Sequence, residues 1–306
     1  MNFIRTQWKD FLQFYFVPFC AALMPWRLAW GWIRWWTRKE GSLFEESAAP
    51  AVAVAPKYLA IPDVAKFAAD ARAIRVVDCC DLFLSRLHRN RAWRPWHVRR
   101  EGEWPVSGPF IAVSFHHGTG HWVFKTLAEA GHDSTLIAAR WSREEHSRYP
   151  LRYRYGRLRG ADTARLSGMP VAYRPGVAEQ LARVLSAGNV VVGVIDMPPR
   201  LAPRGQHRVR VLDCDISLPD GTIKLAQKFG VPLVPYWTEI NLENGTRAFR
   251  IGAPIDPTDE SAALGTLARL LDQQIRGCPP SWHFWSELPQ WVVDAREIRD
   301  VPDQAL

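Results

Sequence analysis

The chain has 306 residues, of which 47% are hydrophobic and 23% are charged, and its formal net charge is +8. This length suits one large α/β domain with a terminal appendage, and the charge favours an anionic partner: phospholipid, nucleic acid or an acidic carrier protein. The 15 tryptophans favour phospholipid, because an indole ring suits a membrane interface. The five cysteines include no C-x-x-C pair, which argues against a disulfide framework or a zinc site and indicates reduced cytosolic thiols.

Residues 1–40 are predicted to form a membrane-associating segment. They contain six tryptophans and six basic side chains against two acidic ones. Pro18 and Pro25 interrupt the longest uncharged run, which is shorter than the ~20 residues that span a bilayer. Apolar side chains recur there at helical spacing, namely Phe19, Leu23, Trp26, Trp30 and Ile33. We expect an amphipathic helix in the membrane interface, and the alternative is a helix that caps the domain core.

Three further segments follow from composition. Residues 41–61 have the alanine- and proline-rich character of a linker, residues 62–295 are expected to form the main domain, and residues 296–306 form a tail. The domain begins with a helical pattern up to Leu87, with Asp63 available to its first turn. Residues 86–100 are basic and aromatic, but nothing near them resembles a nucleic-acid module. We expect them to face solvent or lipid headgroups, and we expect no nucleic-acid partner.

The centre of the chain predicts a strand, a histidine-rich turn and a helix. Residues 110–115 form a short apolar run, which leads into His116, His117 and a Gly-Thr-Gly turn. Apolar residues then recur at helical spacing from Trp122 onward. A histidine at the carboxyl end of a strand lies where α/β sheets hold their ligands, and imidazole titrates close enough to neutral pH to act as a general base.

Strand and helix patterns alternate in the rest of the chain. We expect strands over 135–139, 190–195, 233–237 and 249–251, and helices over 177–185, 221–229 and 261–275. This alternation predicts an α/β fold with a largely parallel mixed sheet flanked by helices.

The order of these features resembles the lysophospholipid acyltransferase-like superfamily, and specifically the late acyltransferases of lipid A biosynthesis, whose central strand ends in His-x4-Asp or His-x4-Glu. His116 matches the family histidine, and Gly118 lies in the matching tight turn. The further segments that are similar to the family, in order, are 136–140, 152–157, 188–196, 218–235 and 279–285. The resemblance implies a glycerol-phosphate acyltransferase-like fold.

The family's acidic residue is absent from its usual place. Counting His-x4 from His116 leads to His121, a histidine where the family has a carboxylate. The resemblance implies that the histidine takes a proton from a hydroxyl that attacks a thioester, while the acid orients the ring. Either another carboxylate replaces the acid, or the rate is low, or the chemistry has changed. Asp196, at the end of a predicted neighbouring strand, is the first candidate, followed by Glu129 and Asp133.

The resemblance implies roles for other residues of the turn. His116 would be the base, with His117 or His121 assisting, and the backbone amides of the turn are candidate oxyanion donors, namely those of Gly118, Thr119 and Gly120. Alternatively, the histidines only satisfy hydrogen bonds in a buried turn. We expect no metal, because no carboxylate or cysteine ligand follows the histidines at a usual spacing.

Arginines supply the remaining candidate binding groups. Arg140, Arg152 and Arg157 are expected to hold a lipid phosphate or the phosphopantetheine of a carrier, because the guanidinium group suits phosphate. The basic loop over 197–211 is expected to meet an acidic acyl carrier protein. The alternative for each of these arginines is a solvated surface.

These expectations predict a membrane-associated acyltransferase on the cytoplasmic face of a bacterial inner membrane. It would need no bound cofactor and would use acyl carrier protein or CoA thioesters as co-substrates. The alternative is an inactive or weakly active relative that binds lipid or acyl carrier protein as a partner. The sequence gives no signal for the oligomeric state.

Overall fold

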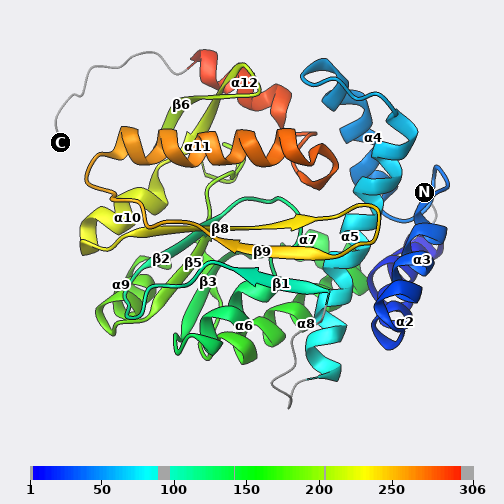
Figure 1. The fold of residues 1–306 in the computed structure, drawn as a ribbon, viewed down its shortest axis with the longest axis horizontal. Coiled ribbons are helices and arrows are strands. Elements are labelled where there is room, and N and C mark those ends of the chain that lie inside the picture. Colours follow the sequence, from blue (N-terminus) through cyan, green and yellow to red (C-terminus); the bar gives the residue numbers. More distant parts are fainter. Residues whose placement is uncertain (1–2, 89–96, 141, 203–204, 298–306) are drawn as a thin grey trace.

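A computed structural model describes residues 3–88, 97–140, 142–202 and 205–297. It confirms an α/β fold in which a seven-stranded sheet lies between layers of helices (Figure 1). Its strands are β1 (Val98–Glu101), β2 (Ile111–Ser114), β3 (Ser134–Ala139), β4 (Ala172–Arg174), β5 (Val190–Val194), β6 (Gln206–Val211), β7 (Cys214–Pro219), β8 (Leu233–Ile240) and β9 (Arg247–Ile251). Its helices are α1 (Phe3–Phe11), the π-helix η1 (Leu12–Phe16), α2 (Val17–Leu23), α3 (Trp26–Thr37), α4 (Glu45–Val54), the 3-10 helix η2 (Ala55–Lys57), α5 (Val64–Leu87), α6 (Trp122–Glu129), α7 (Arg143–Arg148), α8 (Pro150–Ser167), α9 (Ala178–Ser186), α10 (Gly221–Phe229), α11 (Glu260–Gly277), the 3-10 helix η3 (Pro279–Ser281) and α12 (Leu288–Glu297).

The large sheet is mostly parallel, as predicted. Its strand order is β1-β9-β8-β2-β5-β3-β4, and β9 runs antiparallel to β8, with β1 parallel to β9. Strands β8, β2, β5, β3 and β4 all run in one direction. Their carboxyl ends therefore meet at one edge of the sheet, and α5 crosses the molecule near that edge (Figure 1).

Strand β2 lies at the centre of the sheet and is buried on both faces. All four of its residues are buried, and alternate side chains enter two different hydrophobic clusters. Ala112 packs in the cluster that includes α6 and the N-terminal helices, whereas Ile111 and Val113 pack in the cluster that includes α9, α10 and α11. The strand that leads into the histidine turn is thus held on both faces by apolar contacts.

Several predicted helix boundaries are confirmed. The carboxylate of Asp63 accepts a hydrogen bond from the backbone N–H of Lys66 at the start of α5. Gly230, with φ of +59°, ends α10 in the left-handed conformation. The long amphipathic helix near the carboxyl end is α11, and Asp259 accepts a hydrogen bond from Ala262 N–H at its start.

Two segments differ from their predictions. Residues 41–61, expected to be a linker, contain α4 and η2, because Ala48 and Ala51 are buried and α4 packs against α5. The basic loop expected over 197–211 instead forms, in its second half, strand β6 of a hairpin with β7. The hairpin turn uses Leu212 and Asp213 at positive φ in place of the usual glycine, so the sequence carried no standard hairpin signal.

The N-terminal helices share a core with the sheet. Trp26, Trp30 and Ile33, three members of the stripe predicted to face a membrane, are buried in the same cluster as Phe110 and Val190. The prediction was wrong for these three residues, which pack inward, whereas Phe19 and Leu23 of the same stripe are exposed. The helix is also divided at Met24, whose backbone is extended.

Other apolar side chains of residues 1–40 face outward, and they include Phe19 and Leu23 of the predicted stripe. We call this set the N-terminal apolar face, and it consists of Phe3, Ile4, Trp8, Phe11, Phe16, Phe19, Leu23, Leu28 and Trp35. Ring contacts connect Trp8 with Phe11 and Phe11 with Phe16, so part of this face is continuous from α1 to η1. Among the described residues, no helix is long and apolar enough to cross a membrane.

Candidate active site

His116 and Asp196 meet at the carboxyl ends of two adjacent parallel strands. His116 follows β2 and Asp196 follows β5, and the two strands pair directly, with Ser114 opposite Val194. The Nδ1 atom of His116 lies 2.9 Å from Oδ1 of Asp196. Of the three carboxylates considered from the sequence, Asp196 is the one in contact with His116. Asp133 precedes β3 and therefore lies toward the opposite edge of the sheet.

Asp196 also holds the backbone next to the histidine ring. The backbone N–H of His116 donates to both carboxylate oxygens, at 2.9 and 2.8 Å. The indole Nε1–H of Trp282 donates to Oδ2 at 3.1 Å. The Asp196 side chain is fully buried. A carboxylate with this set of donors is held in one orientation.

This arrangement selects one tautomer of His116. An ionised carboxylate only accepts hydrogen bonds, so Nδ1 of His116 carries the proton and Nε2 has a free lone pair. The His116 side chain is 35% exposed. Among the described residues, none forms a hydrogen bond with its Nε2 atom. The ring is therefore placed to accept a proton from a bound molecule.

The segment Trp282–Phe284 covers the histidine. The ring of Phe284 lies 4.3 Å from that of His116, measured between centroids. His283 donates its backbone N–H to the carbonyl oxygen of His116 at 2.8 Å, and its Nε2 lies 2.8 Å from the carbonyl oxygen of Gly118. Burial, together with the nearby charge of Arg75, holds the pKa of His283 well below its usual value. His283 is thus a neutral structural partner of the turn.

The turn after His116 is held by backbone contacts. The N–H of Gly118 donates to the carbonyl oxygen of Ser281 at 2.9 Å. Gly118 has φ of +65°, and a Cβ atom there would lie 2.7 Å from the carbonyl oxygen of Thr238. Position 118 therefore requires glycine on two grounds. His117 points away from solvent, and burial lowers its pKa to about 4, although the backbone of Cys278 and Gln274 opposes this shift.

Thr119 connects the turn to a buried ion pair. Its hydroxyl accepts a hydrogen bond from Arg247 at 2.9 Å, and its carbonyl oxygen accepts one from Thr238 at 2.7 Å. Arg247 forms a bidentate ion pair with Asp81, and both side chains are fully buried. The side chain of Thr119 therefore has a structural role, whereas Gly120 is exposed.

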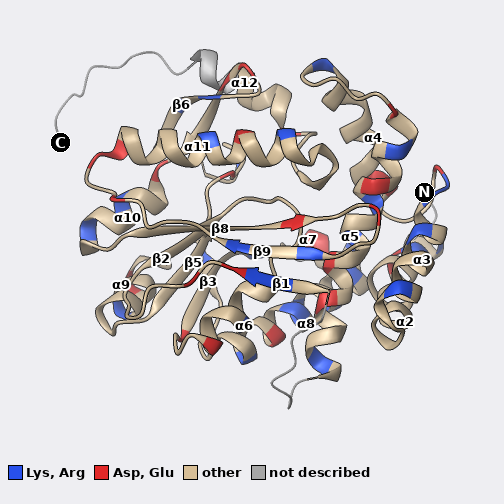
Figure 2. Cartoon of the chain, in the orientation of Figure 1, with Lys and Arg blue, Asp and Glu red and all other residues tan. Residues whose placement is uncertain are grey.

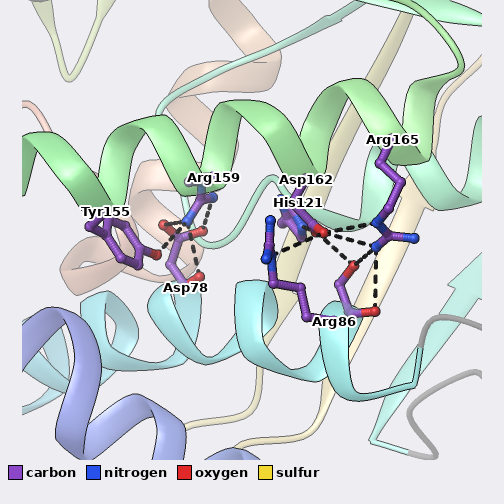
Figure 3. Close-up of polar contacts among 8 residues, drawn as sticks. Asp78, Arg86, His121, Tyr155, Arg159, Asp162 and Arg165 are labelled. Carbon is purple, nitrogen blue, oxygen red and sulfur yellow. Dashed lines mark hydrogen bonds and ion pairs between the residues drawn. The ribbon is translucent and has the colours of Figure 1, made fainter.

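His121 belongs to a second polar cluster, between α5 and α8 (Figure 3). Its Nε2 lies 3.0 Å from Oδ2 of Asp162, and both side chains are fully buried. Ser85 donates to the same oxygen at 2.8 Å, and Arg165 donates to Oδ1 at 2.9 and 3.1 Å. The proposed assistance of His116 by His121 is not seen as a direct contact. His121 thus has its own carboxylate partner, Asp162.

The pKa of Asp162 reflects this cluster. Burial alone would raise it, but hydrogen bonds from His121, Ser85 and Arg165 outweigh burial and lower it to about 2. The ionised carboxylate is therefore the stable form in the folded protein. Relative to the ordinary value of 3.8, this shift corresponds to roughly 2 kcal/mol of folding stability above pH 4.

The three arginines predicted to bind phosphate have different surroundings. Arg152 forms ion pairs with Asp10 at 2.8 Å and Glu46 at 2.9 Å, so it joins α8 to α1 and α4. Arg140 and Arg157 are exposed, the first after β3 and the second on α8. Figure 2 shows basic residues on elements of both helical layers and on strands β1 and β9, rather than gathered on one helix.

The sequence reasoning missed the residues of α5 that approach the site. Arg75, Asp78, Asp81 and Ser85 recur at spacings of three to four residues, which places them on one side of the helix. This polar stripe is a signal that the sequence contains, because its spacing places polar side chains on one side of a helix. The covering residues Trp282–Phe284 had no local signal, because they are distant from His116 in the chain.

Comparisons with known proteins give no identification. No model of a known protein family matches the chain, and no curated protein matches its sequence. The function is therefore inferred from the geometry of the site and from the resemblance of the sequence motifs.

Replacing Asp162 by asparagine is expected to destabilise the protein by roughly 3–5 kcal/mol at neutral pH, because it leaves Arg165 without its buried partner charge. The folded-state pKa lies below the unfolded value, so the stabilisation by the carboxylate is present above pH 4. It is lost as the pH falls through 3.8 toward about 2. Urea unfolding of wild type and variant from neutral pH down to about pH 3 measures this difference, which should shrink with acidification.

Asp215→Asn is the matched control. Asp215 is 47% exposed and pairs with an exposed arginine, so its replacement should change stability by less than ~1 kcal/mol. A pH-independent difference between wild type and Asp162→Asn would show that the carboxylate charge is not what stabilises the cluster.

Proposed function

We propose that this protein is a membrane-associated acyltransferase. It moves an acyl chain from a thioester of acyl carrier protein or CoA to a hydroxyl of a lipid or another amphiphilic acceptor. The observation that carries the proposal is the contact between a half-exposed His116 and a fully buried Asp196 at the carboxyl edge of a parallel sheet. The sequence resemblance described above supports the choice of acyl transfer among reactions that use a histidine base.

The proposed chemistry uses the free Nε2 of His116. Nε2 takes the proton of the acceptor hydroxyl as the hydroxyl oxygen attacks the thioester carbonyl carbon. The carboxylate of Asp196 stabilises the imidazolium that forms. When the tetrahedral intermediate collapses, the C–S bond breaks and the imidazolium returns the proton to the leaving thiolate. The products are the acyl ester and the free thiol.

The oxyanion of the intermediate requires hydrogen-bond donors. The N–H of Gly118 already donates to Ser281, so it is not available for this role. Within the described part of the chain, the N–H groups of Thr119 and Gly120 donate to no protein acceptor. We assign these two amides as the oxyanion donors, since unpaired backbone amides beside a base are suited to developing negative charge.

Membrane attachment is assigned to the N-terminal apolar face. Its members Ile4 and Trp8 are 73% and 62% exposed, and with Phe3, Phe11 and Leu151 they line a shallow hollow of about 340 Å³. Exposed apolar patches of this kind commonly contact membranes or partners. The exposed basic residues beside it, Arg5, Arg27, Arg38 and Lys39, favour anionic phospholipid. The proposed location is the cytoplasmic face of a bacterial inner membrane.

Transfer of acyl groups tests the proposed chemistry. Wild type should acylate components of a bacterial membrane lipid extract when given radiolabelled acyl carrier protein or acyl-CoA, and His116→Ala should abolish this. Asp196→Asn should lower the rate by about 10⁴, the size of effect known for the orienting acid of a catalytic triad. Circular dichroism establishes that each variant is folded.

Two exposed residues provide matched controls for these variants, namely His146 for the His116→Ala change and Asp215 for the Asp196→Asn change. His146→Ala and Asp215→Asn should transfer at the wild-type rate. Transfer by folded His116→Ala would overturn the assignment of the base. Binding of lipid or carrier without transfer by wild type would favour the alternative, a relative that acts as a binding partner.

Sedimentation with anionic vesicles tests the attachment. The double substitution Ile4→Glu and Trp8→Glu should reduce the bound fraction about tenfold, because it places two charges in the apolar face. Val106→Glu with Leu201→Glu is the matched control, since these side chains are 100% and 42% exposed elsewhere on the protein. Equal loss of binding in both double variants would mean that added negative charge, and not the apolar face, controls attachment.

A further inference from the structure

Arg75 brings a cation close to the candidate active site. It lies in the middle of α5, and its Nη2 approaches the carbonyl oxygen of His283 at 3.4 Å. The backbone N–H of the same His283 donates to the carbonyl oxygen of His116 at 2.8 Å. Because one residue spans at most ~3.6 Å, these two links place the guanidinium within ~10 Å of the His116 backbone.

The guanidinium of Arg75 has unused hydrogen-bonding capacity. It carries five N–H donors, and the long contact with His283 occupies one of them. No carboxylate of the described residues forms an ion pair with it. The neighbouring arginine on α5, Arg72, by contrast has a carboxylate partner, since it pairs with Glu45 at 2.8 Å and also donates to the carbonyl oxygen of Thr37 at 2.9 Å.

The carboxylate whose charge acts most strongly on Arg75 is Asp78, and it is already paired. Asp78, one turn along α5, receives two hydrogen bonds from Arg159 at 2.8 and 2.9 Å (Figure 3). Although burial opposes ionisation of Asp78, the charge of Arg159 keeps its pKa below the usual value. The two arginines therefore face one carboxylate, which leaves one positive charge in excess.

The surroundings of Arg75 are protein and not bulk water. Burial lowers the pKa of Arg75, and the charge of Asp78 only partly offsets this effect. His283 is neutral, as described above, so it adds no charge that would repel an anion. As a whole residue, Arg75 is half-buried. A partly desolvated, unpaired cation in such a place is stabilised by binding an anion.

We propose that Arg75 forms a phosphate subsite beside His116. The ligand is a phosphate ester, which an arginine fork binds with two parallel hydrogen bonds. Two sources carry this group: the headgroup of a lipid acceptor and the phosphopantetheine arm of an acyl donor. That the ligand is a substrate rests on the proposed function, whereas phosphate binding at Arg75 does not. This assignment moves the phosphate contact from Arg140, Arg152 and Arg157 to α5.

Calorimetric binding to two pairs of soluble compounds tests the subsite and separates the sources. One pair is dihexanoyl phosphatidic acid and dihexanoylglycerol, and the other is 4′-phosphopantetheine and pantetheine. Wild type should bind the phosphate-bearing member of one pair about tenfold more tightly than its phosphate-free counterpart. The pair that shows this preference identifies the source. Arg75→Gln should abolish the preference, and Arg75→Lys should retain part of it.

Arg183→Gln is the matched control, because Arg183 is an exposed arginine on α9 and its replacement removes the same charge. This variant should keep the preference. The proposal is overturned if wild type prefers neither phosphate compound, or if folded Arg75→Gln keeps the wild-type preference. The wild-type measurement shows whether the protein prefers a phosphate compound even if Arg75→Gln does not fold.

The same binding measurement on His116→Ala separates the subsite from the proposed reaction. If phosphate preference is retained and wild type shows no acyl transfer, the subsite stands and the proposed function falls. If wild type transfers acyl groups but prefers neither phosphate compound, the proposed function stands and the subsite falls.

Discussion

The fully buried carboxylate of Asp196 fixes the geometry on which the candidate active site depends. It accepts hydrogen bonds from the backbone and the ring of His116, and from the indole of Trp282. It thereby joins the ends of β2 and β5 to the segment that precedes α12. Removing it would leave these buried donors unpaired, which is costly in a low-dielectric interior. This one side chain therefore sets the position of the His116 ring and its tautomer. It also holds Trp282, which belongs to the segment that covers the ring.

Helix α5 provides the second support of the site. Its polar stripe contacts two other elements: Asp81 pairs with Arg247 on β9, whereas Asp78 pairs with Arg159 and Ser85 donates to Asp162 on α8. Each contact joins α5 to an element that lies beside the histidine turn. Arg75 belongs to the same stripe but has no such ion pair, and this difference is the basis for assigning it to a ligand. A charge held by the fold without a partner is a common feature of binding sites.

The sequence predicted the fold class and made Asp196 the first candidate for the partner of His116, because both predictions follow from regular patterns. Buried strands at the centre of a parallel sheet are continuous apolar runs, and residues that follow two adjacent strands meet at one edge. Position alone therefore favoured Asp196 over Glu129 and Asp133. The partner of His121 could not be found in this way. Asp162 lies on a helix, and tertiary packing decides which side of that helix faces His121. The same holds for Arg152, whose partners are distant acids.

Amphipathic patterns were less informative about which surface they bury. The stripe through Trp26, Trp30 and Ile33 has the spacing expected of a helix on a membrane, but it packs into the core. The indole N–H groups of Trp26 and Trp30 donate to the carbonyl oxygens of Asn244 and Glu243, contacts that no sequence pattern records. The N-terminal apolar face is formed by Phe19 and Leu23 of the predicted stripe together with residues outside it. Hydrophobic periodicity identifies a buried face, but not the medium that covers it.

The central claim is that Asp196 holds His116 with its Nε2 lone pair free. Long-range ¹H–¹⁵N correlation spectra of the histidine rings, assigned with His116→Gln, report the tautomer directly. The account predicts that neutral His116 carries its proton on Nδ1 and loses this preference in Asp196→Asn. A neutral His116 with its proton on Nε2 would contradict the account, because such a ring could not accept a proton from an acceptor hydroxyl at that atom.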